Sequence, residues 1–265
     1  MKQTGLGSIE GGPGRLGPSV AAVIPAFNEA GTIAEVVGRT LGLVDRTIVV
    51  DDGSSDGTLA RVEGLGVQTL RHDRNRGKGE SLLTGIRAAE EAGFDYVVTL
   101  DADGQHPPEC IPQLVAAADP RAIVLGSRTA TDDAIPLVRY SANQTANFFI
   151  SWAAGHWMSD TQCGFRVYPA GLFRQVRLRR ARASGFVLES EVLIEACRAG
   201  YSVTAVPVPA LYDSVLQRPS HFRPLRDTTA TVGMVTWKIL TWGLFPQGLL
   251  RAQRQRLMIG QPGRP

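Results

Sequence analysis

The chain has 265 residues, with 28 lysines and arginines against 25 aspartates and glutamates, so its formal net charge is +3. With 43% apolar and 20% charged residues, the composition is that of a globular protein and excludes a disordered or fibrous one. So small a charge excess gives no reason to expect nucleic acid as a partner, which requires a concentrated basic face. Cys110, Cys163 and Cys197 are too few for a disulfide framework and lack zinc-site spacing. We therefore expect reduced thiols in a cytoplasmic protein.

The chain begins with a stretch rich in glycine, residues 1–18. It has no apolar core of the kind that a signal peptide needs, so we expect a flexible tail. The folded part is expected to begin at about Val20.

Apolar runs alternate with amphipathic segments over residues 20–127. Continuous apolar runs predict buried strands over 21–27, 46–50, 96–100 and 122–127, with a shorter strand over 67–71. Helices are predicted over 29–43, 57–64, 78–93 and 109–118. This alternation predicts an α/β fold with a mainly parallel sheet flanked by helices. Because ligands bind beyond the carboxyl ends of such strands, we expect the polar turns at those ends to form a site.

The second half of the chain is less regular. Helices are predicted over 138–157 and 187–199 and a strand over 201–211, with the polar residues 159–169 interrupting the pattern. The apolar segment 233–250 is not expected to span a membrane, because a central lysine, Lys238, costs roughly 2.5–3.5 kcal/mol and Pro246 breaks the helix. Arg251, Arg254 and Arg256 follow it. Both a core helix and a helix lying on a membrane surface fit this pattern.

The sequence Asp101-Ala102-Asp103 is the sharpest chemical signal. Two carboxylates one residue apart at the end of a buried strand are costly unless they meet a cation. The alternation of a strand predicts that both side chains share one face. Oxygen ligands of this kind suit Mg²⁺ or Mn²⁺, which usually bind one or two carboxylates together with substrate phosphates. A solvated acidic turn is the alternative.

Four other polar segments allow two interpretations each. The turn 51–57 is either a strand-to-helix connection or supplies a carboxylate to a nucleobase or ribose. Lys78, between two glycines at a helix start, suits a diphosphate contact or a plain basic turn. The segment 160–166 is an irregular loop, or a site loop in which Asp160 and Arg166 face a polar substrate. The cations of segment 220–227 are either solvated or indicate a phosphate partner.

Taken in order, six motifs resemble those of family 2 glycosyltransferases, which have the GT-A fold. They are VIPAFNEA (23–30), VVDDGSSDGT (49–58), NRGKGESLLTGI (75–86), DADGQHPPE (101–109), GSR (126–128) and DTQCGFR (160–166). Within that family the chain looks most like the polyprenyl-phosphate sugar transferases. The resemblance implies a single Rossmann-like GT-A domain over residues 19–227. The tail 1–18 precedes that domain, and an apolar helix and basic tail over 228–265 follow it.

The resemblance also implies roles for individual residues. The nucleotide-sugar donor would be bound by Pro25, Phe27, Glu29, Val50, Asp52, Lys78, Asp101, Ala102 and Asp103. A divalent metal, Mg²⁺ or Mn²⁺, would be held by Asp101, Asp103 and Gln105. The acceptor phosphate would be met by Arg128, Arg139, Ser141, His221 and Arg223. Asp103 and Asp160 would be the catalytic carboxylates.

The implied activity is metal-dependent, inverting transfer of a sugar from a nucleotide-diphosphate sugar, of the UDP-glucose or GDP-mannose type, to a polyprenyl-phosphate lipid. The protein would act in the cytoplasm, on the inner face of the cell membrane if it binds there. A phosphate acceptor is already anionic and needs cations more than a base, so Asp160 is not expected to be a strong base. A soluble glycan or small hydroxyl acceptor, nucleotidyl transfer, and a non-catalytic nucleotide-sugar binding module are the alternatives.

Two departures from the family pattern qualify this reading. Ser214 stands where mannose synthases carry an arginine, which leaves the donor sugar open. Many relatives also carry transmembrane helices at the C-terminus, and no such helix is expected before Pro265.

Overall fold

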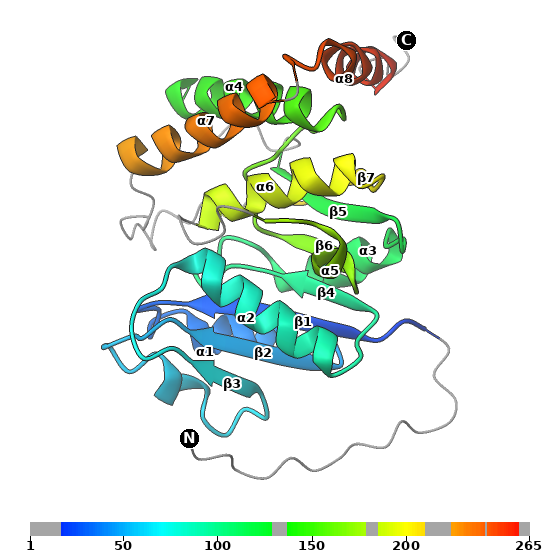
Figure 1. Cartoon of the computed structure of the whole chain (residues 1–265). Coiled ribbons are helices and arrows are strands. Elements are labelled where there is room, and N and C mark those ends of the chain that lie inside the picture. The colour runs from blue at the N-terminus through cyan, green and yellow to red at the C-terminus, as the bar shows by residue number, and fades with distance from the viewer. Residues whose placement is uncertain (1–16, 129–136, 179–184, 210–223, 242, 260–265) are drawn as a thin grey trace.

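The computed structural model describes residues 17–128, 137–178, 185–209, 224–241 and 243–259. Its centre is a seven-stranded sheet of order β3-β2-β1-β4-β6-β5-β7 (Figure 1). The strands are β1 (Val20–Ala26), β2 (Arg46–Asp51), β3 (Gln68–Arg71), β4 (Tyr96–Thr99), β5 (Ala122–Ser127), β6 (Arg166–Pro169) and β7 (Ser202–Pro207). All pairings are parallel except those of β6, which runs antiparallel to β4 and β5. The predicted mainly parallel α/β fold is confirmed.

The predicted helices are present with shifted ends. The helices and 3₁₀ turns are α1 (Ile33–Thr40), η1 (Leu59–Val62), α2 (Lys78–Glu91), η2 (Pro108–Cys110), α3 (Ile111–Ala116), α4 (Leu137–Ala154), α5 (Leu172–Gln175), α6 (Gly185–Arg198), α7 (Pro224–Thr241) and α8 (Pro246–Ile259). The helix expected from residue 29 begins at Ile33, because residues 29–32 form a hydrogen-bonded turn. The helix expected over 57–64 is only a short 3₁₀ turn.

Helices cover both faces of the sheet, which explains the continuous apolar runs of its strands. Ala21 and Val23 of β1 point into one core, which includes residues of α2, α4, α6 and α7. Ala22 and Ile24 point into the other, which includes residues of α1 and α3. Successive residues of a strand face opposite sides, so β1 has to be apolar throughout.

The strand β6 was not predicted, and it decides where the loop before it lies. Its register pairs Thr99 of β4 with Arg166 of β6. Because β6 is antiparallel, it begins at the edge of the sheet where β4 ends. The loop 160–165 is thereby brought beside the turn that carries Asp101 and Asp103.

The helices α4, α7 and α8 form a separate layer above α6 (Figure 1). Lys238 of α7 is buried, and its Nζ atom lies 3.0 Å from Glu191 Oε1 and 2.5 Å from Glu195 Oε1 of α6. Pro246 begins α8, in agreement with the predicted break. Among the described helices, none combines the length and apolarity needed to cross a membrane.

Candidate active site

The predicted donor residues gather where β1 and β2 end. Pro25 and Val50 are register partners in these two strands. The main-chain N–H of Glu29 donates to Thr58 Oγ1 at 2.8 Å, which ties the loop after β1 to the turn after β2. Gly53 fits closely there, because a Cβ atom at this position would lie 2.7 Å from the backbone carbon of Arg74.

Asp52 is buried and organises the loop that leads to α2. Its carboxylate accepts the main-chain N–H groups of Arg76 at 2.9 Å and Gly77 at 2.7 Å. The Nδ1 atom of His72 lies 2.7 Å from the same carboxylate. The predicted donor residue Asp52 therefore sets the position of Lys78, the first residue of α2.

Asp101 and Asp103 lie in a turn beyond β4, not on the strand itself, so the strand-alternation argument for their pairing was wrong. They nevertheless interact. Burial and the negative charge of Asp101 raise the pKa of Asp103 to about 6. Asp101 has a cationic neighbour, since Lys78 Nζ lies 2.6 Å from its Oδ1 atom. Burial by itself would raise the pKa of Asp101. The positive charge of Lys78 and its hydrogen bond lower that pKa, which lies below its ordinary value.

Lys78 lies between two carboxylates. Its Nζ atom is also 3.2 Å from Oε1 of Glu189, a buried residue of α6. Burial disfavours the ammonium, but the charges of Asp101 and Glu189 raise the pKa of Lys78 above its ordinary value. The ammonium stays charged at neutral pH and is positioned to meet an anion.

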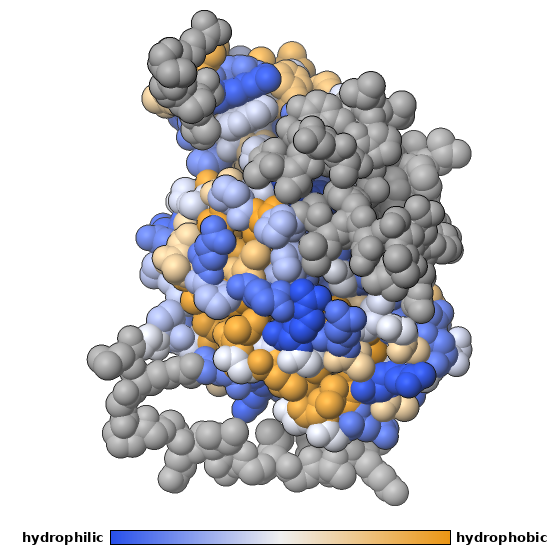
Figure 2. Space-filling model, turned by 180° about the vertical axis from the view of Figure 1, so that it is seen from behind, coloured by the Kyte–Doolittle hydropathy of each residue, from blue (hydrophilic) through white to orange (hydrophobic). Residues whose placement is uncertain are grey.

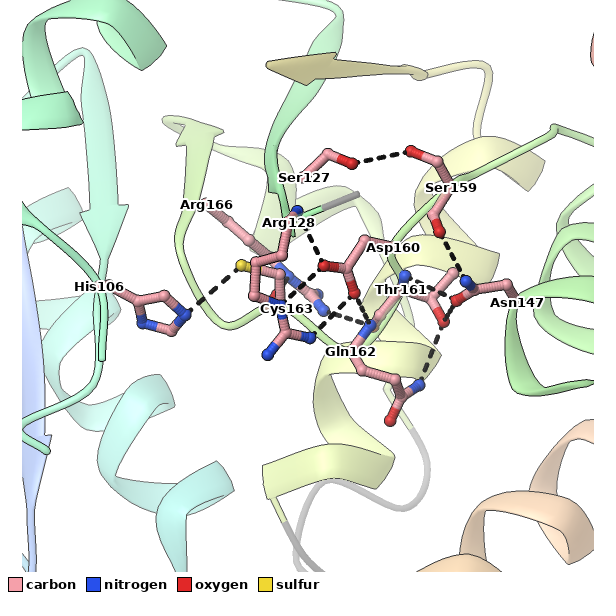
Figure 3. Close-up of polar contacts among 10 residues, drawn as sticks. All are labelled: His106, Ser127, Arg128, Asn147, Ser159, Asp160, Thr161, Gln162, Cys163 and Arg166. Atoms are coloured by element: carbon pink, nitrogen blue, oxygen red, sulfur yellow. Dashed lines mark hydrogen bonds and ion pairs between the residues drawn. The ribbon is translucent and has the colours of Figure 1, made fainter. Parts of the chain in front are cut away.

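On the acceptor side, Arg128 and Asp160 form a two-pronged ion pair (Figure 3). The Arg128 Nε atom lies 2.8 Å from Asp160 Oδ2, and Nη2 lies 3.0 Å from Oδ1. Burial by itself raises the pKa of Asp160, but the hydrogen bonds and charge of Arg128 hold it below its ordinary value. Asp160 is therefore a carboxylate at neutral pH and a weak proton acceptor.

Asn147 of α4 holds the start of the same loop (Figure 3). Its Oδ1 atom accepts from the main-chain N–H of Thr161 at 2.9 Å and from the Thr161 hydroxyl at 2.7 Å. Its Nδ2 atom donates to the carbonyl of Ser159 at 2.6 Å. No motif in the sequence pointed to Asn147, because it lies within the apolar pattern of a long helix.

Arg166 does not face a substrate, contrary to the site-loop interpretation. It is fully buried, and its guanidinium donates to the carbonyl oxygens of Cys163, Thr161 and Glu189 at 2.8, 3.0 and 2.8 Å. A buried arginine has to satisfy its donors internally, and here they fix the backbone of the loop.

His106 and Cys163 lie between the two sides of the site, with His106 Nε2 3.5 Å from Cys163 Sγ (Figure 3). Burial lowers the pKa of His106 to about 4 and raises that of Cys163 to about 12. Both are neutral at pH 7, so neither is a charged participant there.

The remaining predicted acceptor residues are only partly covered by the structure. Arg139 and Ser141 fall on α4, and His221 and Arg223 lie outside the described residues. Gln105 is exposed, and its main-chain N–H donates to Asp103 Oδ1 at 3.0 Å.

The residues at the turn after β4 fit a divalent cation of the kind predicted. The described part of the chain contains no group of three or more histidines, cysteines or acidic residues that could enclose a metal by itself. Mg²⁺ and Mn²⁺ sites that include a substrate diphosphate need only one or two carboxylates. Asp101 and Asp103 supply these, and the raised pKa of Asp103 marks the excess negative charge that a cation would neutralise.

Comparisons with known proteins show which proteins this chain is similar to. The chain is 30% identical over 213 residues to the UDP-N-acetylglucosamine–dolichyl-phosphate N-acetylglucosaminyltransferase of Methanococcus voltae, covering 72% of this chain and 84% of the relative. It is 29% identical over 204 residues to the undecaprenyl-phosphate mannosyltransferase of Micrococcus luteus, covering 71% and 82%.

Solved structures share the fold. Glucosyl-3-phosphoglycerate synthase from Mycobacterium tuberculosis, crystallised with Mn²⁺, UDP and phosphoglyceric acid, aligns with a TM-score of 0.62 at 22% identity, covering 85% of this chain and 78% of the other. Mannosyl-3-phosphoglycerate synthase from Rubrobacter xylanophilus aligns equally well, with a TM-score of 0.62 at 22% identity and coverage of 85% and 75%. The model of the family "Glycosyl transferase family 2" matches residues 21–177. This chain therefore belongs to glycosyltransferase family 2 and is a glycosyltransferase with the GT-A fold.

Proposed function

We propose that this glycosyltransferase moves a sugar from a nucleotide-diphosphate sugar to the phosphate of a polyprenyl-phosphate lipid. The observation that carries the choice of acceptor is the ion pair of Arg128 and Asp160. A hydroxyl acceptor has to lose its proton to a base, and a base works best with a pKa near the working pH. Asp160 has a lowered pKa and is bound on both oxygens. A phosphate acceptor is already ionised and needs no such base.

The names of the relatives support the same acceptor class. Two of them are named for transfer to dolichyl phosphate and undecaprenyl phosphate. Arginine suits the recognition of phosphate because its planar fork donates two parallel hydrogen bonds. Because its Nε and Nη2 atoms bind Asp160, Arg128 would meet the acceptor phosphate mainly by its charge. Two-pronged binding would come from Arg139 or Arg223, together with Ser141 and His221.

On the donor side, Lys78 would meet the diphosphate. The base and ribose would be held by Pro25, Phe27, Glu29, Val50, Asp52 and Ala102. Asp101, Asp103 and Gln105 would hold Mg²⁺ or Mn²⁺. Such an ion, when bound, acts as a Lewis acid that stabilises the leaving diphosphate. The anionic acceptor then displaces that diphosphate in a single step, with inversion at the sugar carbon.

The lipid acceptor implies contact with a membrane surface, and the outer helices have a suitable face. Of the nine exposed large hydrophobic residues in the described part, seven lie between Val232 and Met258, on α7, α8 and the turn between them. Arg251, Arg254 and Arg256 are interspersed with them on α8 and are suited to anionic lipid. In Figure 2 the end of the molecule where α8 lies carries hydrophobic and hydrophilic residues side by side. We include peripheral binding to the inner face of the membrane in the proposal.

The test is release of nucleoside diphosphate from a panel of UDP- and GDP-sugars with Mn²⁺ or Mg²⁺. Each donor is assayed with a short polyprenyl phosphate, with the matching unphosphorylated polyprenol and with a soluble phosphorylated hydroxyl compound. We expect release only with the polyprenyl phosphate and one donor, and a lipid-linked product that carries the sugar on phosphate.

Other outcomes would contradict the proposal in different ways. Release with the polyprenol would show that a hydroxyl is the acceptor and that a base is present. Release with only the soluble compound would replace the lipid by a soluble acceptor, and release of pyrophosphate would indicate nucleotidyl transfer.

A further inference from the structure

Glu189 belongs to no donor motif, yet it reaches the donor side of the site. Its side chain is only 3% exposed, and its Oε1 atom lies 3.2 Å from Lys78 Nζ. The same ammonium lies 2.6 Å from Asp101 Oδ1. One cation from the start of α2 is thus shared by two carboxylates, one from α6 and one from the turn after β4.

The position of Glu189 is fixed from two directions. Arg166 Nη1 donates to the main-chain carbonyl of Glu189 at 2.8 Å, which anchors the backbone. Gly164 lies directly against the charged groups, because a Cβ atom there would be 3.1 Å from both Glu189 Oε1 and Lys78 Nζ, and 3.2 Å from Asp101 Oδ1. The Lys78 ammonium is therefore bounded on one side by the backbone at Gly164 and on the others by its two partners.

The sharing matters because the ammonium and a metal ion would compete for Asp101. A buried carboxylate needs a counter-charge, and a buried ammonium needs one too. With Glu189 present, the Lys78 ammonium keeps a carboxylate partner when Asp101 binds a metal ion instead. Without the Glu189 charge, Lys78 would hold Asp101 more tightly, and the cation would have to displace it.

We propose that Glu189 is a positioning residue that holds Lys78 beside the diphosphate site and so frees Asp101 for the metal ion. This inference rests on the metal site included in the proposed function. It concerns binding of the metal ion and does not depend on which acceptor the enzyme uses.

The test is a Mn²⁺ titration of the full chain with a saturating nucleoside diphosphate, UDP and GDP in separate series, monitored by electron paramagnetic resonance, with neither acceptor nor sugar present. It compares the wild type with E189Q, K78M and the double variant. We expect E189Q to weaken Mn²⁺ binding about 10-fold, which is typical of groups that orient a metal ligand. Removing Lys78 should strengthen Mn²⁺ binding much more in the E189Q background than in the wild type, because only there is the ammonium confined to Asp101.

The matched control is Glu191→Gln. Glu191 lies on the same helix, is equally buried and also pairs with a lysine, Lys238, at 3.0 Å. It should leave the Mn²⁺ affinity unchanged. If E189Q does not fold, Glu189→Asp replaces it, since it keeps the charge and draws it away from Lys78; we expect a smaller weakening in the same direction, and an unchanged affinity would overturn the proposal.

Three outcomes would overturn different parts of the proposal. Wild-type affinity in E189Q would overturn the role of Glu189. An effect of K78M that is equal in both backgrounds would also overturn it, because a carboxylate acting only by its own charge gives no coupling to Lys78. A wild type that binds no Mn²⁺ would overturn the metal site itself, and with it this role, while leaving the choice of acceptor untouched.

Discussion

The two carboxylates predicted to be catalytic, Asp103 and Asp160, have pKa values that their surroundings shift in opposite directions. Burial and the charge of Asp101 raise the pKa of Asp103 to about 6. Arg128 outweighs the effect of burial on Asp160 and keeps its pKa below the ordinary value. The charge on the donor side of the site therefore changes around pH 6, whereas the Arg128–Asp160 pair stays charged there.

The ionised Asp103 side chain should lower the free energy of unfolding of the metal-free protein at neutral pH. A carboxyl whose pKa is raised on folding favours the native state below its unfolded pKa, near 4, and loses that contribution as pH rises through 6. Asp103→Asn should therefore stabilise the metal-free protein at pH 7 by up to about 3 kcal/mol, since each pKa unit corresponds to about 1.4 kcal/mol. The gain should vanish near pH 3.5.

Urea unfolding at both pH values measures this difference. The exposed Glu91→Gln, at the far end of α2, is the control and should change stability at neither pH. Mn²⁺ added together with a nucleoside diphosphate should raise the urea midpoint of the wild type more than the diphosphate alone does, and should not do so for Asp103→Asn. An equal stability change at pH 7 and pH 3.5 would show that ionisation of Asp103 is not the cause.

Asp160→Asn tests whether this residue is a base. We expect turnover to fall by less than about 100-fold, the lower range of general-base effects. The reason is that the carboxylate is already bound to the Arg128 guanidinium and is a weak proton acceptor. The KM for the acceptor should change more than kcat, because Arg128 loses the partner that orients it. Steady-state kinetics with the polyprenyl phosphate proposed as acceptor measure both parameters.

Glu109→Gln is the matched control, since Glu109 forms another two-pronged pair, with Arg39, on the surface. It should leave both parameters unchanged. A loss of about 1,000-fold in kcat for Asp160→Asn would instead identify Asp160 as the base.

At the scale of elements, α6 connects the site to the outer helices. Glu189 faces Lys78, whereas Glu191 and Glu195 face the buried Lys238 of α7. Lys238→Met removes the buried cation that Glu191 and Glu195 share and should destabilise the protein by about 3–5 kcal/mol. Chemical denaturation measures the loss, and Arg251→Met, on the exposed side of α8, should be neutral. A midpoint equal to that of the wild type would mean that Lys238 does not join the two helices.

The elements that the sequence predicts well are those with a long, unmixed pattern. The runs that became β1, β2, β4 and β5 were recognised because strands covered on both faces are apolar throughout. The strand β6 was missed because its four residues, Arg166–Pro169, include a buried arginine whose partners are distant or main-chain atoms. Strand direction is a tertiary property that no local pattern encodes.

The site was predictable where a motif concentrates polar residues and not where a single residue reaches in from a core helix. Asp101, Asp103, Lys78 and Asp160 were named in advance, and the structure brings the first three together with the loop that carries the fourth. Glu189 was missed inside an apolar helix. Three glutamates on a buried helix were the available signal, because a buried carboxylate implies a partner.

For the whole molecule, binding to anionic vesicles should depend on the face formed by α7 and α8. Leu250→Ser combined with Leu257→Ser removes two side chains that are 60% and 70% exposed and should reduce flotation with phosphatidylglycerol vesicles. Leu41→Ser is the control, because Leu41 is exposed at the end of α1, away from this face. Equal flotation of the double variant and the wild type would exclude these helices as the membrane contact.

The three carbonyl bonds of Arg166 have a consequence for how this enzyme can diversify. Two of them fix the loop 160–165 through the backbone oxygens of Thr161 and Cys163, which every amino acid supplies, and the third ties Arg166 to Glu189 of α6. The path of the loop thereby depends little on the side chain of Gln162, the one residue of the loop that is not buried. Gln162 is thus open to exchange with little risk to folding, and a library restricted to this position explores acceptor preference on an unchanged scaffold.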